Sequence, residues 1–427
     1  MKIHFIGIGG IGLSALARFF SHCGHEVSGS DIANTSLTQK LQKEGMKVSV
    51  PHSKNNITDQ DLVIYSAVIK PTNEEFQEAK ERGILTIPRR EALSYILGDK
   101  KVYSVCGAHG KSTTTAILAS ILKSSALIGA ESKEFGSNAY FSLAKNNIIA
   151  FEADESDGSF LNSNPYCAIV TNAEPEHMEY YKYDYENFYQ SYHKFLQTAK
   201  IRVINAEDPY LCTVLLDCVK LFPSKDIANM RYEVVDGEPA TFFNLKDLGE
   251  FRVWGFGYHI ALDASLAILA ALHEMDIETI RENIKNFKGI KKRFDVVKKE
   301  SNFTLIDDYA HHPTEIEATL KSALLYAKLN NLSSVTAIWQ PHKFSRTIDN
   351  LDRFVECFSG VDKLVILPVW SAGEKEVELD FKKLFARYNP IICSDFKAAK
   401  KLTELEKGLV IGFGAGDITY QLRESCH

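Results

Sequence analysis

The segment GAHGKSTTT at residues 107–115 follows a strand-like run at Val102–Val105 and opens a helical stretch that we expect to extend to Lys123. A lysine behind a glycine-rich loop reaches the β- and γ-phosphates of a nucleotide, and the hydroxyl that follows it binds magnesium. The usual pattern has a glycine where this chain has Val105, so the loop is a shortened variant. Its strand–loop–helix context predicts an α/β domain that binds ATP, and the alternative is a capped helix with a solvent-exposed lysine.

A second glycine-rich loop lies at the start of the chain. Gly7, Gly9 and Gly12 form the pattern G-x-G-x-x-G between an apolar strand and a helix, and Asp31 follows the next strand. Such a loop lets the backbone approach a diphosphate, and the acid can bind a ribose hydroxyl. Taken alone, the loop favours a nicotinamide-dependent dehydrogenase, and a strand–helix turn without a ligand is the other interpretation. Two phosphate loops on two domains instead indicate an ATP-driven transferase or ligase that acts on a nucleotide-linked substrate.

Short apolar runs alternate with amphipathic helical stretches along the whole chain. This pattern predicts βαβ units with mainly parallel sheets, and therefore an α/β fold. We place boundaries at Gly98 and Gly289, which gives three consecutive domains that cover residues 1–98, 99–288 and 289–427.

Three segments are harder to assign. We expect a helix at 180–192 and short antiparallel strands within 223–250. Seven of the fifteen residues from Lys285 to Lys299 are Lys or Arg. That segment is either a solvated, mobile linker or a hinge that carries phosphate ligands.

The composition is that of an ordinary globular protein, with 427 residues, 45% apolar and 24% charged. The net charge of -6 argues against a protein that coats nucleic acid, because such proteins have basic surfaces. The eight cysteines are scattered without a C-x-x-C pair, which is typical of thiols in a reducing cytosol. We recognise no signal peptide or membrane span, and we expect a soluble, cytoplasmic protein without nucleic-acid or membrane partners.

Acidic and histidine-containing clusters follow four further apolar runs. EADESD at 152–157 and TNAEPEH at 171–177 belong to the central domain, and DDYAHHP at 307–313 and QPHKFSR at 340–346 belong to the C-terminal domain. Open α/β sheets bind their ligands at the edge where such clusters lie. The carboxylates suit magnesium, with His177 as a further candidate ligand, and the His, Lys and Arg groups suit a carboxylate or a phosphate. Solvated polar loops are the alternative.

Nine blocks resemble the Mur ligase family, in the family's order: GIGGIGLSALA at 7–17, SGSDI at 28–32, GAHGKSTTT at 107–115, EADESDGSFL at 152–161, TNAEPEHM at 171–178, KKRFD at 291–295, DDYAHHPTE at 307–315, QPHKFSRT at 340–347 and GAGDI at 414–418. The resemblance implies three domains in sequence: a Rossmann-like UDP-sugar domain, a P-loop ATPase domain and a Rossmann-like amino-acid domain. It implies that ATP, with one or two Mg²⁺ ions, drives amide formation between L-alanine and the carboxylate of UDP-N-acetylmuramate through an acyl phosphate, in cytoplasmic peptidoglycan synthesis. The alternative within the family is attachment of a whole peptide to the same UDP-sugar. We expect these small molecules as partners, and a monomer or a weak homodimer.

The resemblance also implies roles for individual residues, carried over by position. The UDP-sugar would be bound by Gly7, Gly9, Gly10, Gly12, Asp31, Ser66 and Arg89. ATP would be bound by Gly107, Ala108, His109, Gly110, Lys111, Ser112, Thr113 and Asp263. The catalytic residues would be Lys111, Glu152, His177, Arg293, His311 and His312, and the metal ligands would be Ser112, Glu152 and His177. The carboxylate of the amino acid would be held by His342 and Arg346.

The chain departs from the family pattern at several positions. A segment from His259 to Asp263 replaces His-Asn-x-x-Asn, which puts adenine recognition by paired asparagines in doubt. Ala108 stands where threonine is usual, and Lys343 and Phe344 replace the usual Arg-Tyr. We expect these changes to tune nucleotide affinity. A dehydrogenase and a non-catalytic, nucleotide-gated regulator are the competing hypotheses.

Overall fold

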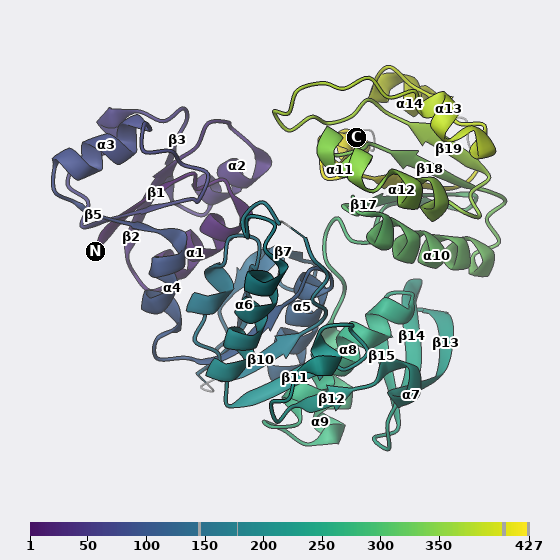
Figure 1. Cartoon of the computed structure of the whole chain (residues 1–427), viewed down its shortest axis with the longest axis horizontal. Helices are drawn as coiled ribbons and strands as arrows, with labels where there is room; N and C mark the ends of the chain where they lie inside the picture. The colour runs from purple at the N-terminus through teal and green to yellow at the C-terminus, as the bar shows by residue number, and fades with distance from the viewer. Residues whose placement is uncertain (144–146, 177, 404–406, 425–427) are drawn as a thin grey trace. The chain divides into compact units, whose positions relative to one another are not determined.

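A computed structural model describes residues 1–143, 147–176, 178–403 and 407–424 of the chain. The chain forms two compact units. The first consists of residues 1–228, 244–251 and 262–288, and the second of residues 229–243, 252–261 and 289–427. Figure 1 labels many of the helices and strands of both units.

The first unit begins with a five-stranded parallel sheet in the order β3-β2-β1-β4-β5. Its elements are β1 (Lys2–Ile6), α1 (Ile11–His22), β2 (Glu26–Ser30), α2 (Ser36–Lys43), β3 (Lys47–Ser49), the 3₁₀ helix η1 (Lys54–Asn56), β4 (Leu62–Tyr65), α3 (Glu74–Glu81), β5 (Leu85–Pro88) and α4 (Arg89–Leu97). This order is Rossmann-like, as expected, and it reverses at β1. The loops that follow β1 and β4 therefore border the crevice where such sheets bind their ligands.

The helix α1 forms where the sequence places an apolar stripe directly after the glycines. Leu13, Leu16 and Phe20 recur at helical spacing and are buried. They join a core with Ile3 and Phe5 of β1, so the helix that follows the glycine loop is fixed to the strand that precedes it.

A seven-stranded sheet in the order β12-β11-β10-β6-β9-β7-β8 completes the core of the first unit. Its elements are β6 (Lys101–Cys106), α5 (Lys111–Leu122), β7 (Ser125–Ser132), β8 (Ser137–Tyr140), β9 (Ile148–Glu152), η2 (Ser159–Asn162), β10 (Cys167–Val170), α6 (Tyr185–Thr198), β11 (Ile201–Asn205), η3 (Leu211–Thr213) and β12 (Val219–Leu221). Only β7 and β8 pair antiparallel among the described pairs. The expected helix at 180–192 is wrong at its start: residues before Asp184 form turns, and Asp184 caps α6 by accepting from Asn187 N.

Beyond β12 the chain forms a small three-stranded sheet, β13-β14-β15. In this region residues 229–243 and 252–261 belong to the second unit, and residues 244–251 belong to the first. The elements here are α7 (Pro223–Asp226), β13 (Ile227–Val235), β14 (Glu238–Leu245), β15 (Glu250–Trp254), α8 (Tyr258–Ala271), α9 (Ile277–Asn283) and η4 (Ile284–Asn286). Strands were expected within 223–250, but β13 and β14 are longer than predicted, at nine and eight residues.

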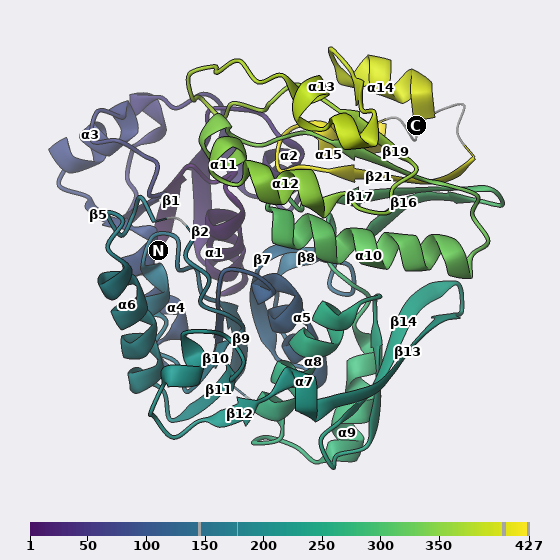
Figure 2. The same ribbon diagram turned by 45° about the vertical axis from the view of Figure 1, so that its right-hand side comes forward.

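The second unit is built on a six-stranded sheet in the order β16-β17-β21-β18-β19-β20. Its elements are β16 (Asp295–Glu300), β17 (Phe303–Asp308), α10 (Pro313–Leu329), β18 (Val335–Trp339), α11 (Phe344–Asp349), α12 (Leu351–Cys357), β19 (Lys363–Ile366), α13 (Phe381–Leu384), η5 (Ala386–Tyr388), β20 (Ile391–Ile392), α14 (Phe396–Thr403), β21 (Gly408–Phe413) and α15 (Ile418–Glu424). All described pairs are parallel except β16 with β17. Figure 2 shows α10 running alongside this sheet.

The basic segment at 285–299 is therefore not a linker throughout. Asp295 and the residues after it form the antiparallel edge strand β16, and η4 precedes it. A strand rich in Lys is a common edge strand, because exposed charges discourage pairing with another chain.

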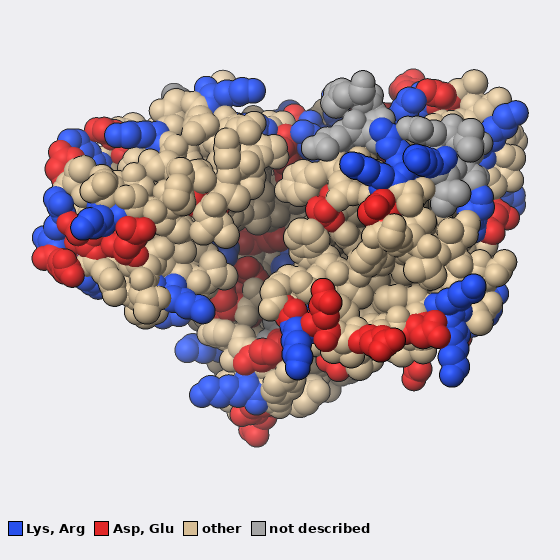
Figure 3. Space-filling view, turned by 90° about the horizontal axis from the view of Figure 1, so that it is seen from above, with Lys and Arg blue, Asp and Glu red and all other residues tan. Residues whose placement is uncertain are grey.

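No described helix is long and apolar enough to cross a bilayer. On the face drawn in Figure 3, acidic and basic side chains lie interspersed among larger areas of other residues. Seven of the cysteines lie in the described part of the chain, and all seven are free thiols.

Candidate active site

The first glycine loop turns sharply at the carboxyl end of β1. Gly7 has a φ of +87°, a conformation that glycine adopts without strain. The N–H of Gly9 donates to Asp31 Oδ2 at 2.8 Å, and Asp31 Oδ1 accepts from Ile32 N at 2.8 Å. A Cβ at Gly9 would lie only 2.7 Å from Asp31 Oδ2, so a side chain at residue 9 would displace this carboxylate from the loop.

The other expected UDP-sugar residues lie at the same edge of this sheet. Gly10 caps α1, and its N–H donates to Gly7 O at 3.1 Å. Ser66 follows β4, and its Cβ would be 3.2 Å from a Cβ at Gly7. Arg89 is the first residue of α4, directly after β5, and its guanidinium lies against Gly12. The structure thus brings all seven residues together at the carboxyl ends of β1, β2, β4 and β5.

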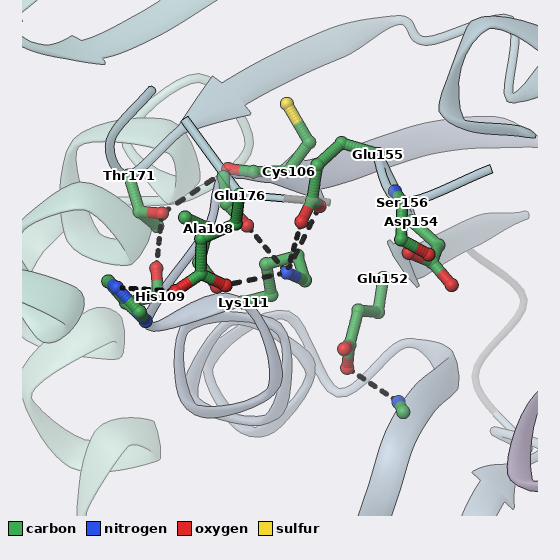
Figure 4. A network of polar contacts seen from close by, with 12 residues as sticks. Cys106, Ala108, His109, Lys111, Glu152, Asp154, Glu155, Ser156, Thr171 and Glu176 are labelled. Carbon is green, nitrogen blue, oxygen red and sulfur yellow. Dashed lines mark hydrogen bonds and ion pairs between the residues drawn. The ribbon is translucent and has the colours of Figure 1, made fainter. Parts of the chain in front are cut away.

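The second glycine loop connects β6 to α5 and surrounds Lys111. Gly107 and Gly110 have φ values of +138° and +82°. The Lys111 ammonium donates to Gly107 O at 2.6 Å, to Ala108 O at 3.1 Å and to Glu155 Oε1 at 3.0 Å. An ammonium has three protons, so these three acceptors use all of them. Figure 4 shows Lys111 and Glu155 pointing toward each other.

Glu155 is a buried acid, and its role was not recognised in the sequence. It is 1% exposed. Burial raises its pKa to about 7, although Lys111 opposes this shift. Burial alone would lower the pKa of Lys111, but the charges of Glu155, Asp154 and Glu152 raise it above its ordinary value. Lys111 therefore keeps its charge, and Glu155 is the group of the pair that can take up a proton near neutral pH.

Two candidate magnesium ligands lie beyond or at the ends of the neighbouring strands β6 and β9. Ser112 is in the first turn of α5, followed by Thr113, and Glu152 ends β9, the neighbour of β6. Glu152 Oε2 accepts from Gly129 N at 2.5 Å (Figure 4). A hydroxyl and a carboxylate beside a phosphate-binding loop are the hard oxygen donors that magnesium prefers, so this donor set fits the ion. The third candidate ligand, His177, lies outside the described residues.

His109 of the same loop is held by the end of β10. Its backbone N–H donates to Asn172 Oδ1 at 3.1 Å, and its carbonyl accepts from Thr171 Oγ1 at 2.5 Å and Asn172 Nδ2 at 3.0 Å. Its Nε2 lies 3.3 Å from Glu174 Oε2 and 3.5 Å from Glu176 Oε1. The sequence block TNAEPEH thus has a positioning role toward the loop, which follows only from the adjacency of β10 and β6.

Asp263 of α8 lies against the same loop. A Cβ at Gly110 would be 2.4 Å from Asp263 Oδ1. Asp263 is 5% exposed, so a buried carboxylate approaches the N-terminus of α5, where the helix dipole favours a negative charge. The position expected to read the adenine is therefore next to the phosphate-binding turn.

In the second unit, His342 and Arg346 lie together after β18. Arg346 Nη1 lies 3.1 Å from His342 Nδ1. A guanidinium can only donate, so Nδ1 accepts and the proton of the neutral ring is on Nε2. Burial, Arg346 and Lys343 lower the pKa of His342 to about 4, so the neutral form prevails at neutral pH.

His311 has the opposite tautomer. Its Nδ1 lies 3.0 Å from Tyr309 O, a carbonyl that can only accept, so Nδ1 carries the proton and Nε2 a lone pair. Burial is the main cause that lowers its pKa to about 3. The rings of His311 and His342 are 5.7 Å apart and nearly perpendicular. An imidazole that accepts and one that donates thus stand side by side next to the Arg346 guanidinium.

Arg293 and His312 complete the group that the second unit assembles. Arg293 Nη1 lies 3.1 Å from Glu315 Oε1 and its guanidinium 5.8 Å from the ring centre of Tyr309. His312 caps α10 and is buried. Glu315 also accepts from the backbone N–H groups of His311 and His312, at 3.1 Å and 3.4 Å. The carboxylate of Glu315, which sequence reasoning missed, therefore fixes both histidine positions.

Models of three Mur ligase domains match the chain. The Mur ligase family catalytic domain matches residues 2–101, the Mur ligase middle domain 105–222, and the Mur ligase glutamate ligase domain 292–416. Together they cover more than half of the chain. The chain belongs to the Mur ligase family. All nine sequence blocks that resemble the family lie within these three matched segments or overlap them.

Relatives of this Mur ligase match over nearly the full length of both chains. A UDP-N-acetylmuramate–L-alanine ligase of Campylobacter curvus is 57% identical over 99% of each chain. One of Helicobacter pylori is 53% identical over 99% of this chain and 96% of the other. The crystal structure of the UDP-N-acetylmuramate–alanine ligase MurC of Thermotoga maritima matches with a TM-score of 0.85 at 26% identity, covering 100% of this chain and 98% of the other. A murein peptide ligase of Psychrobacter arcticus shares the fold, with a TM-score of 0.68 at 21% identity and the same coverage.

Proposed function

We propose that this Mur ligase joins L-alanine to the carboxylate of UDP-N-acetylmuramate and converts ATP to ADP and phosphate in doing so. The product is UDP-N-acetylmuramoyl-L-alanine, a precursor of peptidoglycan. The observation that carries this proposal is the pair of phosphate-binding loops, at β1 and at β6, on two adjoining sheets of the first unit. A dehydrogenase has no use for the second loop. The named relatives, alike over the whole chain, support the choice of L-alanine as the acceptor.

The reaction needs ATP because a carboxylate is a poor acyl donor. An oxygen of the muramoyl carboxylate attacks the γ-phosphorus, the bond to the bridging oxygen of ADP breaks, and an acyl phosphate forms. The amine nitrogen of alanine then attacks the acyl carbon, and phosphate leaves with the electrons of the C–O bond. The nitrogen loses its protons to solvent or to a base. Charge stabilisation and positioning supply most of the catalysis in such steps.

The first unit supplies the groups for phosphoryl transfer. We assign the diphosphate of the UDP-sugar to the loop at Gly7–Gly12, with Asp31 and Ser66 beside it. We assign the ATP phosphates to the loop at Gly107–Thr113, where Lys111 moves from its backbone acceptors to the transferring phosphoryl group. Ser112, Glu152 and His177 would hold magnesium, which neutralises phosphate charge when bound.

The second unit supplies the groups for the amine. Arg346, steadied by His342, suits the carboxylate of the amino acid, because a guanidinium binds a carboxylate through two parallel hydrogen bonds. The lone pair on His311 Nε2 can accept an N–H of the amine and orient the nitrogen lone pair for attack. Arg293 and His312 would meet the phosphate oxygens of the acyl phosphate. The corresponding domains are 1–98 for the UDP-sugar, 99–288 for ATP and 289–427 for the amino acid.

The proposal is tested by measuring ADP release with purified protein, ATP, Mg²⁺ and UDP-N-acetylmuramate. We expect rapid release with L-alanine, little without an amino acid, and a product with the mass of the alanyl adduct. Parallel reactions receive glycine, L-serine or a peptide that begins with L-alanine. Faster turnover with the peptide would favour the runner-up activity, that of a murein peptide ligase. Equal release with and without any acceptor would contradict a ligase.

We further propose that the protein acts in the cytoplasm as a monomer or a weak homodimer. The substrates proposed for it are water-soluble nucleotides and an amino acid. Sedimentation at several protein concentrations measures the oligomeric state, and fractionation of cells that express the tagged chain tests the location.

A further inference from the structure

Trp370 is an exposed aromatic residue whose backbone pairs with the segment that carries His342 and Arg346. It follows β19 and forms a parallel bridge with His342. Trp370 N donates to Pro341 O, and Lys343 N donates to Trp370 O, both at 2.8 Å. Residues that lie opposite each other in a parallel ladder project their side chains from the same face. The indole therefore projects from the same face as the His342 imidazole, whose Nδ1 contacts Arg346.

The indole is packed against the loop that follows β21. A Cβ at Gly416 would lie 2.8 Å from Trp370 Cγ and 3.0 Å from Trp370 Cβ, so a side chain at residue 416 would displace the indole. In the sheet, β21 lies between β17 and β18. The rings of His311 and His342, which follow these two strands, are 5.7 Å apart. Aromatic rings from the loops after β17, β18 and β19 therefore gather at the carboxyl end of β21.

The loop that carries Trp370 is tied to the segment beside it. Glu374 accepts from Ser345 N at 3.0 Å and from Ser345 Oγ at 2.7 Å. Lys343 has a φ of +68°, a conformation that costs a non-glycine residue free energy and persists only where the surrounding contacts enforce it. Trp370 is nevertheless 42% exposed. The indole thus combines a fixed position with a free apolar face, at the edge where α/β sheets bind their ligands.

L-alanine offers three groups to this edge of the second unit. With its carboxylate on Arg346 and its amine on His311 Nε2, the remaining substituent of Cα is the methyl group, which is best buried against an apolar surface. We propose that the indole of Trp370 is the wall against which this methyl group packs, and that it limits the size of the amino-acid side chain. The inference rests on the proposed function, because it takes an L-amino acid as the acceptor. It makes Trp370 a specificity-determining residue.

Such a wall discriminates in two directions. Glycine has no methyl group and gains nothing from the indole, whereas the longer side chain of L-2-aminobutyrate collides with it. One methylene more or less in an apolar pocket changes kcat/KM by about 10- to 200-fold. Removing the wall should therefore weaken the preference for L-alanine over glycine and over L-2-aminobutyrate at the same time.

The test measures kcat/KM of the full chain for L-alanine, glycine and L-2-aminobutyrate, with ATP, Mg²⁺ and UDP-N-acetylmuramate saturating. For Trp370→Ala we expect the ratio of L-2-aminobutyrate to L-alanine to rise at least about tenfold and the ratio of L-alanine to glycine to fall. KM for ATP and for UDP-N-acetylmuramate should stay unchanged. Trp370→Phe should keep most of the wild-type selectivity, and Trp370→Leu should lie between the two.

Leu329→Ala is the matched control. Leu329 is 41% exposed and ends α10, directly before β18, so it lies near the amino ends of the strands and away from the proposed wall. Its truncation removes a similarly exposed apolar side chain and should leave both ratios unchanged. Each ratio compares two amino acids on one variant, so a smaller fraction of folded protein cancels from it.

The possible results separate this inference from the proposed function. If Trp370→Ala lowered kcat/KM equally for the three amino acids, Trp370 would only support the loop, and the inference would be overturned. If that variant did not fold, unchanged ratios in Trp370→Leu would overturn it as well. Normal ligation of L-alanine by the wild type, with unchanged ratios in the variants, would remove this inference alone. Failure of the wild type to ligate any amino acid would contradict the proposed function itself.

Discussion

Lys111 and Glu155 form a buried pair whose members have different tasks. Lys111 serves the phosphates in the proposed reaction, whereas Glu155, at 1% exposure, balances its charge inside the fold. When one member of a buried pair is replaced, the other is left without its partner, and this remaining group determines how much the free energy of unfolding falls. A substitution of Lys111 should therefore affect activity and stability for different reasons: activity through the lost contact with phosphate, and stability through the charge left on Glu155.

We expect Lys111→Met to abolish ADP release and to lower the free energy of unfolding at pH 7 by about 2 kcal/mol, since Glu155 loses its cation but can take up a proton. An acid whose folded pKa is raised contributes stability at low pH that is lost as the pH rises through that pKa. The wild-type pKa of Glu155 is raised to about 7, and the substitution raises it further. The stability difference should therefore be larger at pH 8 than at pH 6, as measured by urea unfolding.

The double variant Lys111→Met/Glu155→Gln is the control. It should recover most of the lost stability, because an amide is less costly to bury than a carboxylate, and it should remain inactive. A double variant as unstable as Lys111→Met would show that the lost stability comes from the contacts of Lys111 with Gly107 O and Ala108 O instead.

Arg346 gives a second prediction for a single residue. Arg346→Lys removes the forked guanidinium and its contact with His342 Nδ1, so we expect KM for L-alanine to rise about 10- to 100-fold while KM for ATP stays unchanged. Burial holds the pKa of His342 at about 4, so the ring is neutral at both pH 6 and pH 8 and the effect should be the same at both. A rise in KM for ATP of similar size would contradict the assignment. Arg353→Lys, elsewhere in the second unit, serves as the control.

Among the elements, the sequence predicted best the strands and helices that combine an apolar run with a glycine or proline boundary. The strand predicted at Val102–Val105 is β6 (Lys101–Cys106), and the strand predicted before the first glycine loop is β1 (Lys2–Ile6). The helix after each glycine loop was also predicted, because the loop fixes its first residue. These are the elements that carry the two glycine loops and Lys111.

Other elements depend on contacts distant in sequence. The tyrosine-rich segment has helical spacing from residue 180 onward, yet α6 begins only at Tyr185, where Asp184 supplies a cap. Nothing local distinguishes the edge strand β16 from a basic linker, since its identity comes from pairing with β17. The same holds for the site: Glu155 stands in the acidic block at 152–157, but its pairing with Lys111 follows only from the adjacency of β6 and β9.

A buried polar network at the N-terminal sheet also depends on contacts between residues that are distant in sequence. Glu75 of α3 is fully buried and accepts from Ser53 N at 3.0 Å and Asn56 Nδ2 at 2.6 Å, and from Ser30 Oγ. The ring of His4 in β1 lies 3.4 Å from the same carboxylate. The network ties α3, β1, β2 and η1 together through one charge.

We expect Glu75→Gln to lower the free energy of unfolding at pH 7 by about 3 kcal/mol. Burial would raise the pKa of Glu75, but the hydrogen bonds from His4, Asn56, Ser30 and Ser53 lower it to about 2, against 4.5 ordinarily. A lowered acid pKa contributes stability above its unfolded value, and each unit is about 1.4 kcal/mol. The difference between wild type and variant should shrink as the pH falls from about 4.5 toward 2.

Glu81→Gln, exposed on the same helix, is the matched control and should change the stability by less than about 0.5 kcal/mol. Urea unfolding from pH 7 down to pH 3 gives both curves. If the difference in the free energy of unfolding between wild type and Glu75→Gln did not become smaller in acid, the lost stability would come from altered packing and not from the charge of Glu75.

For the molecule as a whole, the proposed reaction divides its groups between the two units. Lys111 and the UDP-sugar residues belong to the first, and His311, His342 and Arg346 to the second. The amine must nevertheless reach the acyl carbon, and reacting atoms need to approach to about 3–3.5 Å. Substrates that bind to both units must therefore favour the arrangement in which these groups meet.

Small-angle scattering can measure this effect. With UDP-N-acetylmuramate, a non-hydrolysable ATP analogue, Mg²⁺ and L-alanine together, we expect a smaller radius of gyration and a narrower distance distribution than for the protein alone, because hinge closure around ligands is the usual way of completing such a site. UDP-N-acetylmuramate alone is the control: it occupies only the first unit in this scheme, and it should leave the radius of gyration nearly unchanged. If the full set of ligands changed the radius of gyration no more than UDP-N-acetylmuramate alone, ligand binding would not be what brings the residues of the two units together. The reaction would then have to proceed from the arrangement that the protein adopts without ligands.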